Sequence, residues 1–223
     1  MDNDHVEGPS TRRLDLLPTA DRLLQACRAL AIAEAGLNHN PVTRWHTVTS
    51  TEADEWICRV SDGSGNEALL WFGSVGAVIR GFGHESEMSP WAHPADLWPG
   101  LDEGFPPELR RAPTIRVAGV ESVTFLIWRS AGDQQWSIGP IELPVAFGAD
   151  PDGSEFLLRP ISQPVEGHQF LEEYYERKVP RAAVDKLFQS APLTIELFEE
   201  LGAVRSLDDL VAEARVIGYP AAP

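Results

Sequence analysis

The spacing of apolar residues changes character twice along the chain, and this change constrains the fold more than any other feature. Between Thr19 and Gly36 the apolar residues recur on one helical face, with Thr19 as the N-cap and Gly36 at the end. The chain then becomes rich in Val, Ile, Trp and Phe, and after Pro164 the helical spacing returns. Strands followed by helices are typical of an α+β domain, in which helices lie on one face or at one end of an antiparallel sheet.

Several short stretches in the middle of the chain have the composition of β-strands. Turn residues at 62–65 and 74–76 separate neighbouring stretches as hairpin loops do. We therefore expect a twisted antiparallel sheet of about six strands. The stretches span residues 44–49, 55–60, 67–73, 76–82, 120–129, 135–138 and 155–160.

After residue 163 the apolar residues recur at helical spacing and predict a C-terminal helical cluster. Pro180 stands at a first helical position, and Thr194 and Ser206 are expected N-caps. We expect residues 1–18 to form a polar leader and residues 19–223 a single α+β domain. In this domain, residues 19–162 supply the N-terminal helix and the sheet, and residues 163–223 supply a helical part packed on them.

The chain carries a net charge of −16, which makes nucleic acid or an anionic membrane an unfavourable direct partner, because phosphate contacts need clustered Lys and Arg. Long-range attraction favours a basic protein partner instead. The N-terminus is acidic and polar where a secretory signal is basic and then apolar, and no apolar run approaches the ~20 residues of a membrane span. These features predict a cytoplasmic protein in which Cys27 and Cys58 are reduced and mostly buried.

The segment from residue 81 to residue 109 holds two His, six carboxylates and two Trp, and neither Lys nor Arg. A stretch of this length without secondary structure is usually either functional or disordered, and its aromatic residues argue against disorder. We expect this segment to be the working surface, with its Trp side chains either contacting a partner or anchoring the loop. The candidate partner-binding residues are Glu85, Glu87, Trp91, Asp96 and Trp98.

A metal site is a second interpretation of the same segment, because imidazole and carboxylate groups are ligands of Zn²⁺, Mn²⁺ and Fe²⁺. A metal-dependent hydrolase would use a carboxylate there to activate bound water. The spacing matches no established metal motif, and in a simpler interpretation His84 and Glu85 order the loop by hydrogen bonding to its backbone. The candidate ligands are His84, Glu85, Glu87 and His93.

Catalysis has little other support in the sequence. The chain has no nucleophile elbow of the Gly-x-Ser-x-Gly type, and the carboxylates are too numerous for any pair to stand out. No catalytic residue is assigned, no cofactor is expected, and a binding function is favoured over an enzymatic one.

Four separated motifs resemble a family of uncharacterised bacterial proteins. The longest, GAVIRGFGHESEMSPW at residues 76–91, includes the acidic segment described above. The others are DGSEF at residues 152–156, YYER at 174–177 with Val-Pro at 179–180, and IGYP at 217–220. The resemblance extends over most of the chain and implies a bacterial cytoplasmic protein, without bringing an activity, a cofactor or a catalytic residue. By analogy with small acidic cytoplasmic proteins that neutralise toxins, the expected function is immunity-type binding of a basic protein toxin.

Overall fold

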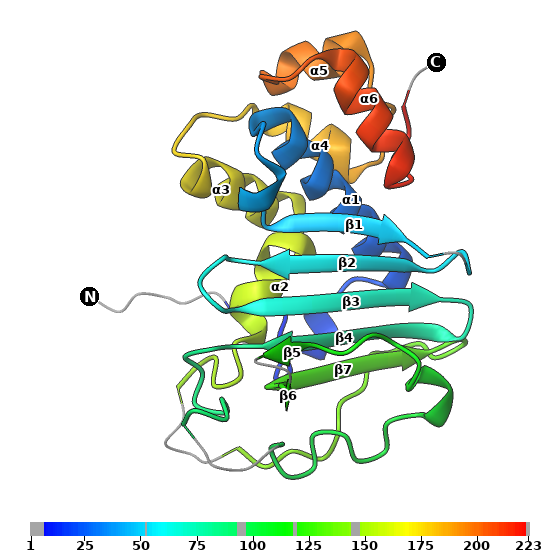
Figure 1. Cartoon of the computed structure of the whole chain (residues 1–223), viewed down its shortest axis with the longest axis vertical. Helices are drawn as coiled ribbons and strands as arrows, with labels where there is room; N and C mark the ends of the chain where they lie inside the picture. The colour runs from blue at the N-terminus through cyan, green and yellow to red at the C-terminus, as the bar shows by residue number, and fades with distance from the viewer. Residues whose placement is uncertain (1–6, 52, 93–96, 118–119, 144–147, 222–223) are drawn as a thin grey trace.

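The computed structural model describes residues 7–51, 53–92, 97–117, 120–143 and 148–221. Within these ranges the chain forms a five-stranded antiparallel sheet, a separate two-stranded ribbon and six α-helices (Figure 1). The α+β class, the N-terminal helix and the C-terminal helical cluster expected from the sequence are confirmed.

The main sheet is a meander of four strands joined by a fifth that arrives after a long loop. The expected turn at residues 62–65 forms because the side chain of Asp62 accepts hydrogen bonds from the backbone N–H groups of Ser64 (2.7 Å) and Asn66 (3.0 Å). All neighbouring strands pair antiparallel. In spatial order the strands are β1 (His46–Ser50), β2 (Trp56–Ser61), β3 (Glu67–Gly73), β4 (Gly76–Phe82) and β7 (Phe125–Ser130).

Successive side chains of these strands enter two different apolar layers, one on each face of the sheet. On β4, Ile79 packs in the layer that includes the helices, whereas Val78 packs in the opposite layer. On β7, Ile127 and Trp128 divide in the same way. Both faces of the sheet are therefore buried, which explains why the central strands have nearly continuous apolar sequences.

Two of the helices that follow the sheet begin where the expected N-caps Thr194 and Ser206 predict. The side-chain oxygen of Thr194 accepts a hydrogen bond from the backbone N–H of Leu197 (3.3 Å), and that of Ser206 from Asp209 (3.2 Å). No helix in the described ranges combines the length and the apolar character needed to cross a membrane. The helices are α2 (Ser154–Ser162), α3 (Pro164–Tyr174), α4 (Arg181–Phe188), α5 (Ile195–Leu201) and α6 (Leu207–Val216).

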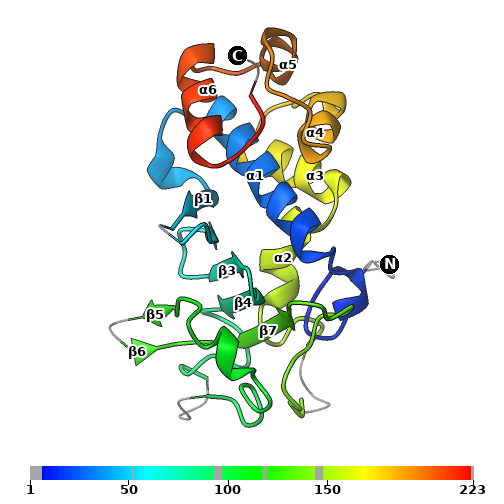
Figure 2. The same ribbon diagram turned by 90° about the vertical axis from the view of Figure 1, so that its right-hand side faces the viewer.

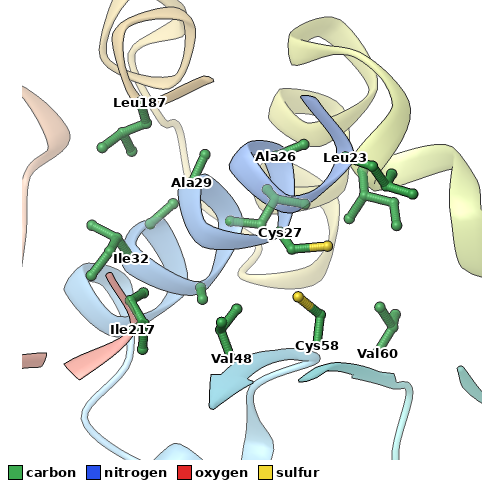
Figure 3. Packing of buried hydrophobic residues seen from close by; sticks show 14 of the residues in the cluster. Leu23, Ala26, Cys27, Ala29, Ile32, Val48, Cys58, Val60, Leu187 and Ile217 are labelled. Atoms are coloured by element: carbon green, nitrogen blue, oxygen red, sulfur yellow. The ribbon is translucent and has the colours of Figure 1, made fainter. Parts of the chain in front are cut away.

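The N-terminal helix α1 (Ala20–Leu37) lies at the centre of the helical layer and contacts β1, α2, α3, α4, α5 and α6 (Figure 2). The expected N-cap is confirmed, since the Thr19 side chain accepts a hydrogen bond from the backbone N–H of Arg22. Cys27 of α1 and Cys58 of β2 are buried and free, and their sulfur atoms face each other in the core (Figure 3). Burial, together with the neighbouring Cys27 thiol, raises the pKa of Cys58 and keeps it protonated.

The strand expected at residues 155–160 is wrong, because these residues belong to α2. Leu157, Leu158 and Ile161 are fully buried and lie on one helical face, a spacing that no strand accommodates. The carboxyl group of Asp150 also accepts hydrogen bonds from two backbone N–H groups in the first turn, those of Glu155 (3.0 Å) and Phe156 (2.9 Å). Pro160 is accommodated in the last turn, and the helix ends two residues later.

The main sheet has five strands instead of about six. The stretch expected at residues 120–129 is divided between β7 and β6 (Val120–Glu121), and β6 pairs with β5 (Arg116–Val117) in the ribbon. Residues 135–138 contribute one bridge, between Ser137 and Trp128, and no named strand. Gly139 and Pro140 follow at once, and because proline has no backbone N–H it ends further pairing.

The described part of the leader, residues 7–18, packs against the start of α2. The Thr11 hydroxyl donates a hydrogen bond to the carboxyl group of Asp152 (2.5 Å), and the Thr11 backbone N–H donates one to the Ser154 hydroxyl (3.1 Å). Ser10 and Thr11 are buried. These residues are thus part of the folded structure although their sequence is polar.

Candidate binding surfaces

The loop between β4 and β7 covers the sheet face opposite the helices. Its buried side chains Met88, Leu101, Phe105 and Leu109 belong to the same apolar layer as Val78 of the sheet. The loop is therefore ordered by its apolar residues, and its outward-facing side chains are the ones left to contact a partner.

Two of the motifs that carry the family resemblance meet at the start of this loop. A Cβ atom at Gly83 would lie 2.9 Å from the carbonyl oxygen of Asp152, so only glycine allows this approach. The hydroxyl of the fully buried Thr124 accepts a hydrogen bond from the Gly83 N–H (2.9 Å) and donates one to the Asp152 carbonyl (2.6 Å). The Met88 N–H donates to the Pro151 carbonyl (3.1 Å). This contact fastens the loop to the N-terminus of α2.

The polar residues of the segment also order the loop, although not in the expected way. Glu87 accepts a hydrogen bond from the backbone N–H of Gly148 at 3.0 and 3.1 Å from its two oxygens. The backbone N–H of His84, and not its ring, donates a hydrogen bond to the side-chain oxygen of Asn66 (2.8 Å). The His84 side chain is left exposed at the surface.

The two tryptophans of the segment have different environments. Trp91 is 61% exposed, with its ring centroid 6.4 Å from that of His84, and Glu85 nearby in the sequence is exposed too. Trp98 is half-buried against the apolar layer, and its Nε1 donates a hydrogen bond to the Glu142 carbonyl (3.2 Å). Trp91 therefore remains available to a partner, whereas Trp98 anchors the loop.

The expected metal set is only partly within the described residues, because His93 lies outside them, as does Asp96 of the partner-binding set. In the part of the chain that the structure describes, no three His, Cys, Asp or Glu side chains come close enough to hold a metal ion. Both carboxylate oxygens of Glu87 also accept a hydrogen bond from the Gly148 backbone N–H, so they stabilise the loop and do not face a metal site.

A second candidate surface, which the sequence did not indicate, is a cavity of about 420 Å³ between the start of β1 and the helices α2 and α3. The Trp45 ring forms part of its wall, with its centroid 5.5 Å from that of Phe156 and 5.0 Å from that of Phe170. The strand expected at residues 155–160 did not predict this cavity, because the helix is what brings Phe156 beside Trp45. An aromatic residue at the polar start of α2 was the one available signal.

Carboxyl groups predominate around this cavity. Among the described residues that line it, Arg159 is the one basic residue; it pairs with Glu155, and its guanidinium group lies 3.6 Å from the Glu166 carboxylate. Two further lining carboxyl groups belong to Asp150 and Glu173. Burial, with a smaller contribution from Asp152, raises the pKa of Asp150 to about 6, against the lowering effect of its two backbone hydrogen bonds.

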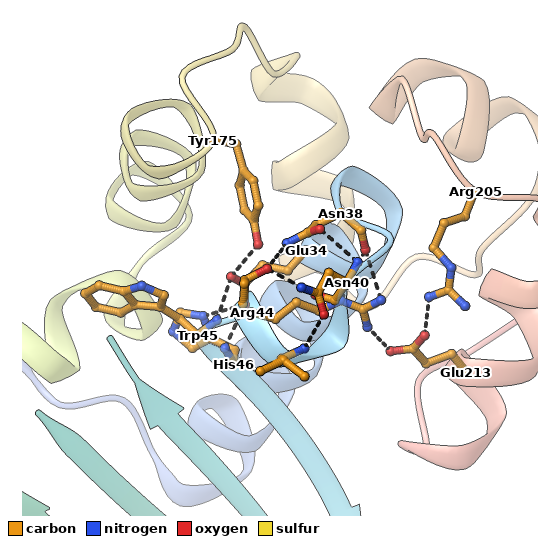
Figure 4. A network of polar contacts seen from close by, with 11 residues as sticks. Glu34, Asn38, Asn40, Arg44, Trp45, His46, Tyr175, Arg205 and Glu213 are labelled. Carbon is orange, nitrogen blue, oxygen red and sulfur yellow. Dashed lines mark hydrogen bonds and ion pairs between the residues drawn. The ribbon is translucent and has the colours of Figure 1, made fainter. Parts of the chain in front are cut away.

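A buried polar network positions Trp45 (Figure 4). The fully buried carboxyl group of Glu34 accepts hydrogen bonds from the backbone N–H groups of Trp45 (3.0 Å) and His46 (2.7 Å) and from the Tyr175 hydroxyl (2.9 Å). Its second oxygen lies 2.9 Å from Nδ1 of His46. Burial and Glu34 raise the pKa of Tyr175, so its hydroxyl remains a donor. The network joins α1, β1 and the end of α3, and the indole ring extends away from it.

Comparisons of this chain with protein-family models, with curated proteins and with solved structures found no match. The function is therefore inferred from the two surfaces themselves.

Proposed function

We infer that this protein binds a basic protein partner through the part of the loop that carries Glu85 and Trp91. The exposure of Trp91 is the observation that carries the proposal, because this large ring lies at the surface although Met88 and Ser89 just before it are buried. An aromatic side chain that is already positioned loses little conformational freedom on binding and is a common interface hot spot. The net charge of −16 selects a basic partner.

Neutralisation of a basic protein toxin, in the manner of a bacterial immunity protein, is the concrete form of this proposal. An acidic inhibitor attracts a basic toxin over long distances and so associates quickly. Asp96 and Glu87 belong to the expected interface, although Glu87 also holds the loop.

The alternative of a metal-dependent hydrolase has weaker support. Its candidate ligands His84, Glu85 and Glu87 do not converge among the described residues, and Glu87 is engaged with the backbone. We therefore retain the binding function.

The test uses the products of the genes that neighbour the coding gene in its native host. A basic product that is toxic when expressed alone should be neutralised by co-expression of this protein and should bind it in calorimetry. The Trp91→Ala variant should bind at least ~30-fold more weakly, which corresponds to about 2 kcal/mol for a hot-spot residue. Val216→Ala, which truncates an exposed side chain on α6, is the control and should bind normally. Unchanged binding by Trp91→Ala, or the absence of any bound neighbour product, contradicts the proposal.

A further inference from the structure

The cavity beside Trp45 combines two features that proteins use to bind organic cations. Aromatic faces attract a cation through the ring quadrupole, and carboxyl groups supply opposite charge. Trp45, Phe156 and Phe170 supply the aromatic surface, and Phe156 is 49% exposed at the cavity opening. The cavity volume of about 420 Å³ lies in the range of small-molecule sites.

Among the described residues that line the cavity, four carry carboxyl groups and one carries a guanidinium group. Arg159 satisfies Glu155 and Glu166 through its ion pairs, so these three residues form one partly neutralised cluster. Glu173 is exposed and forms no ion pair with another described residue. The carboxyl group of Asp150 accepts hydrogen bonds from the backbone N–H groups of Glu155 and Phe156 and also contacts Asp152, and it forms no ion pair with another described residue. A negative charge excess thus surrounds an aromatic wall.

We propose that this cavity is a binding site for a small organic cation, namely a guanidinium or primary ammonium group carried on an apolar chain. The apolar chain lies against Phe156 and Trp45, and the cationic group lies between Asp150 and Glu173. Elsewhere in the same lining, the guanidinium group of Arg159 already lies between two carboxylates, those of Glu155 and Glu166. The cavity shares no residue with the loop surface around Trp91, so this proposal is independent of the partner proposed above.

The rigidity of the wall supports a preformed site. Trp45 is held by its backbone hydrogen bond to the buried Glu34, and Phe170 stacks on Tyr174 with ring planes 9° apart. The Tyr174 hydroxyl donates to the Thr43 carbonyl (2.7 Å), which ties α3 to the segment before β1. A ligand therefore meets side chains that are already in place, which lowers the entropic cost of binding.

The experiment titrates n-butylguanidinium chloride into the purified protein and follows the indole N–H signal of Trp45 by NMR, assigned with the Trp45→Phe variant. We expect a saturable shift with a dissociation constant of about 10 mM or tighter, as for a fragment-sized ligand. The neutral analogue N-butylurea should bind at least ~10-fold more weakly, because it lacks the charge. Higher salt should weaken the cation only.

The variants are placed at exposed positions, so that a loss of binding cannot result from a loss of folding. Glu173→Gln and Phe156→Ala should each weaken n-butylguanidinium about threefold or more, since they remove the unpaired charge and a ring face. Glu103→Gln makes the same charge change on an exposed residue of the long loop and should leave binding unchanged. Thermal melts confirm that all three variants fold.

A parallel titration with the peptide acetyl-Gly-Arg-Gly-amide identifies the source of the cation. Equal binding of the peptide supports an arginine side chain of another protein, and binding of n-butylguanidinium alone supports a free amine or guanidine metabolite. Three results overturn the proposal: no saturable shift, equal binding of N-butylurea, or preferential binding of acetate through Arg159.

Discussion

Asp150 caps α2 with a carboxyl group that burial makes difficult to ionise. Its oxygens accept the first-turn N–H groups of Glu155 and Phe156, and this contact favours the charged form. Burial and the nearby Asp152 oppose ionisation more strongly, so the pKa of Asp150 rises to about 6. A capping contact that benefits the helix therefore carries a cost in stability at neutral pH.

The Asp150→Asn variant tests this balance. Because the pKa of Asp150 is higher in the folded than in the unfolded state, its stabilising contribution is complete below about pH 4 and is lost as the pH rises through about 6. The wild type should lose up to about 3 kcal/mol relative to Asp150→Asn between about pH 4 and pH 7. Urea unfolding of both proteins across this range measures the difference. A difference that is constant with pH contradicts the assignment.

Individual elements were predicted from the sequence where local residues determine them. The N-cap of α1 at Thr19 and the turn closed by Asp62 depend on neighbouring backbone groups, so their sequence signals were sufficient. The path of the long loop depends instead on contacts between residues that are distant in the sequence, such as those of Phe105 with Trp128 and of Met88 with Pro151. The cavity could not be predicted for the same reason, since Trp45 and Phe156 meet only after α2 has formed.

The two tryptophans of the loop provide a test at this scale. Trp98→Ala removes a ring from the apolar layer and a hydrogen bond to the Glu142 carbonyl, so it should lower the free energy of unfolding by about 2 kcal/mol or more. Trp91→Ala, at a position 61% exposed, should change it by about 0.5 kcal/mol or less. Denaturant midpoints of the single variants measure both effects. Equal losses would show that Trp91 is also an anchor and would remove the main support for the binding surface.

In the molecule as a whole, the main sheet lies between two apolar layers, one on each of its faces. Helices cover one face, and a loop with little regular structure covers the other. The order of strands and helices in the sequence predicted the first layer. This order did not predict the second layer. Segment 81–109 has an acidic composition, which gave no indication of how many apolar side chains it buries.

Adjacent residues on β4 test whether the two layers unfold together. Ile79→Ala affects the helical layer and should cost about 3 kcal/mol, and Val78→Ala affects the opposite layer and should cost about 2 kcal/mol. Because one sheet supports both layers, each variant should shift a single transition seen equally by tryptophan fluorescence and far-ultraviolet circular dichroism. Separate fluorescence and dichroism midpoints in Val78→Ala would show that the loop layer melts on its own.

The central position of α1 has a consequence for synthesis on the ribosome. This helix has a buried face that includes Leu23, Leu30 and Ile32, and it is translated well before its partners α4 and α6. A nascent chain must therefore keep part of an apolar helix face uncovered until α6 has left the exit tunnel. Premature stop codons anywhere before α6 should yield aggregates bound by chaperones instead of smaller folded fragments.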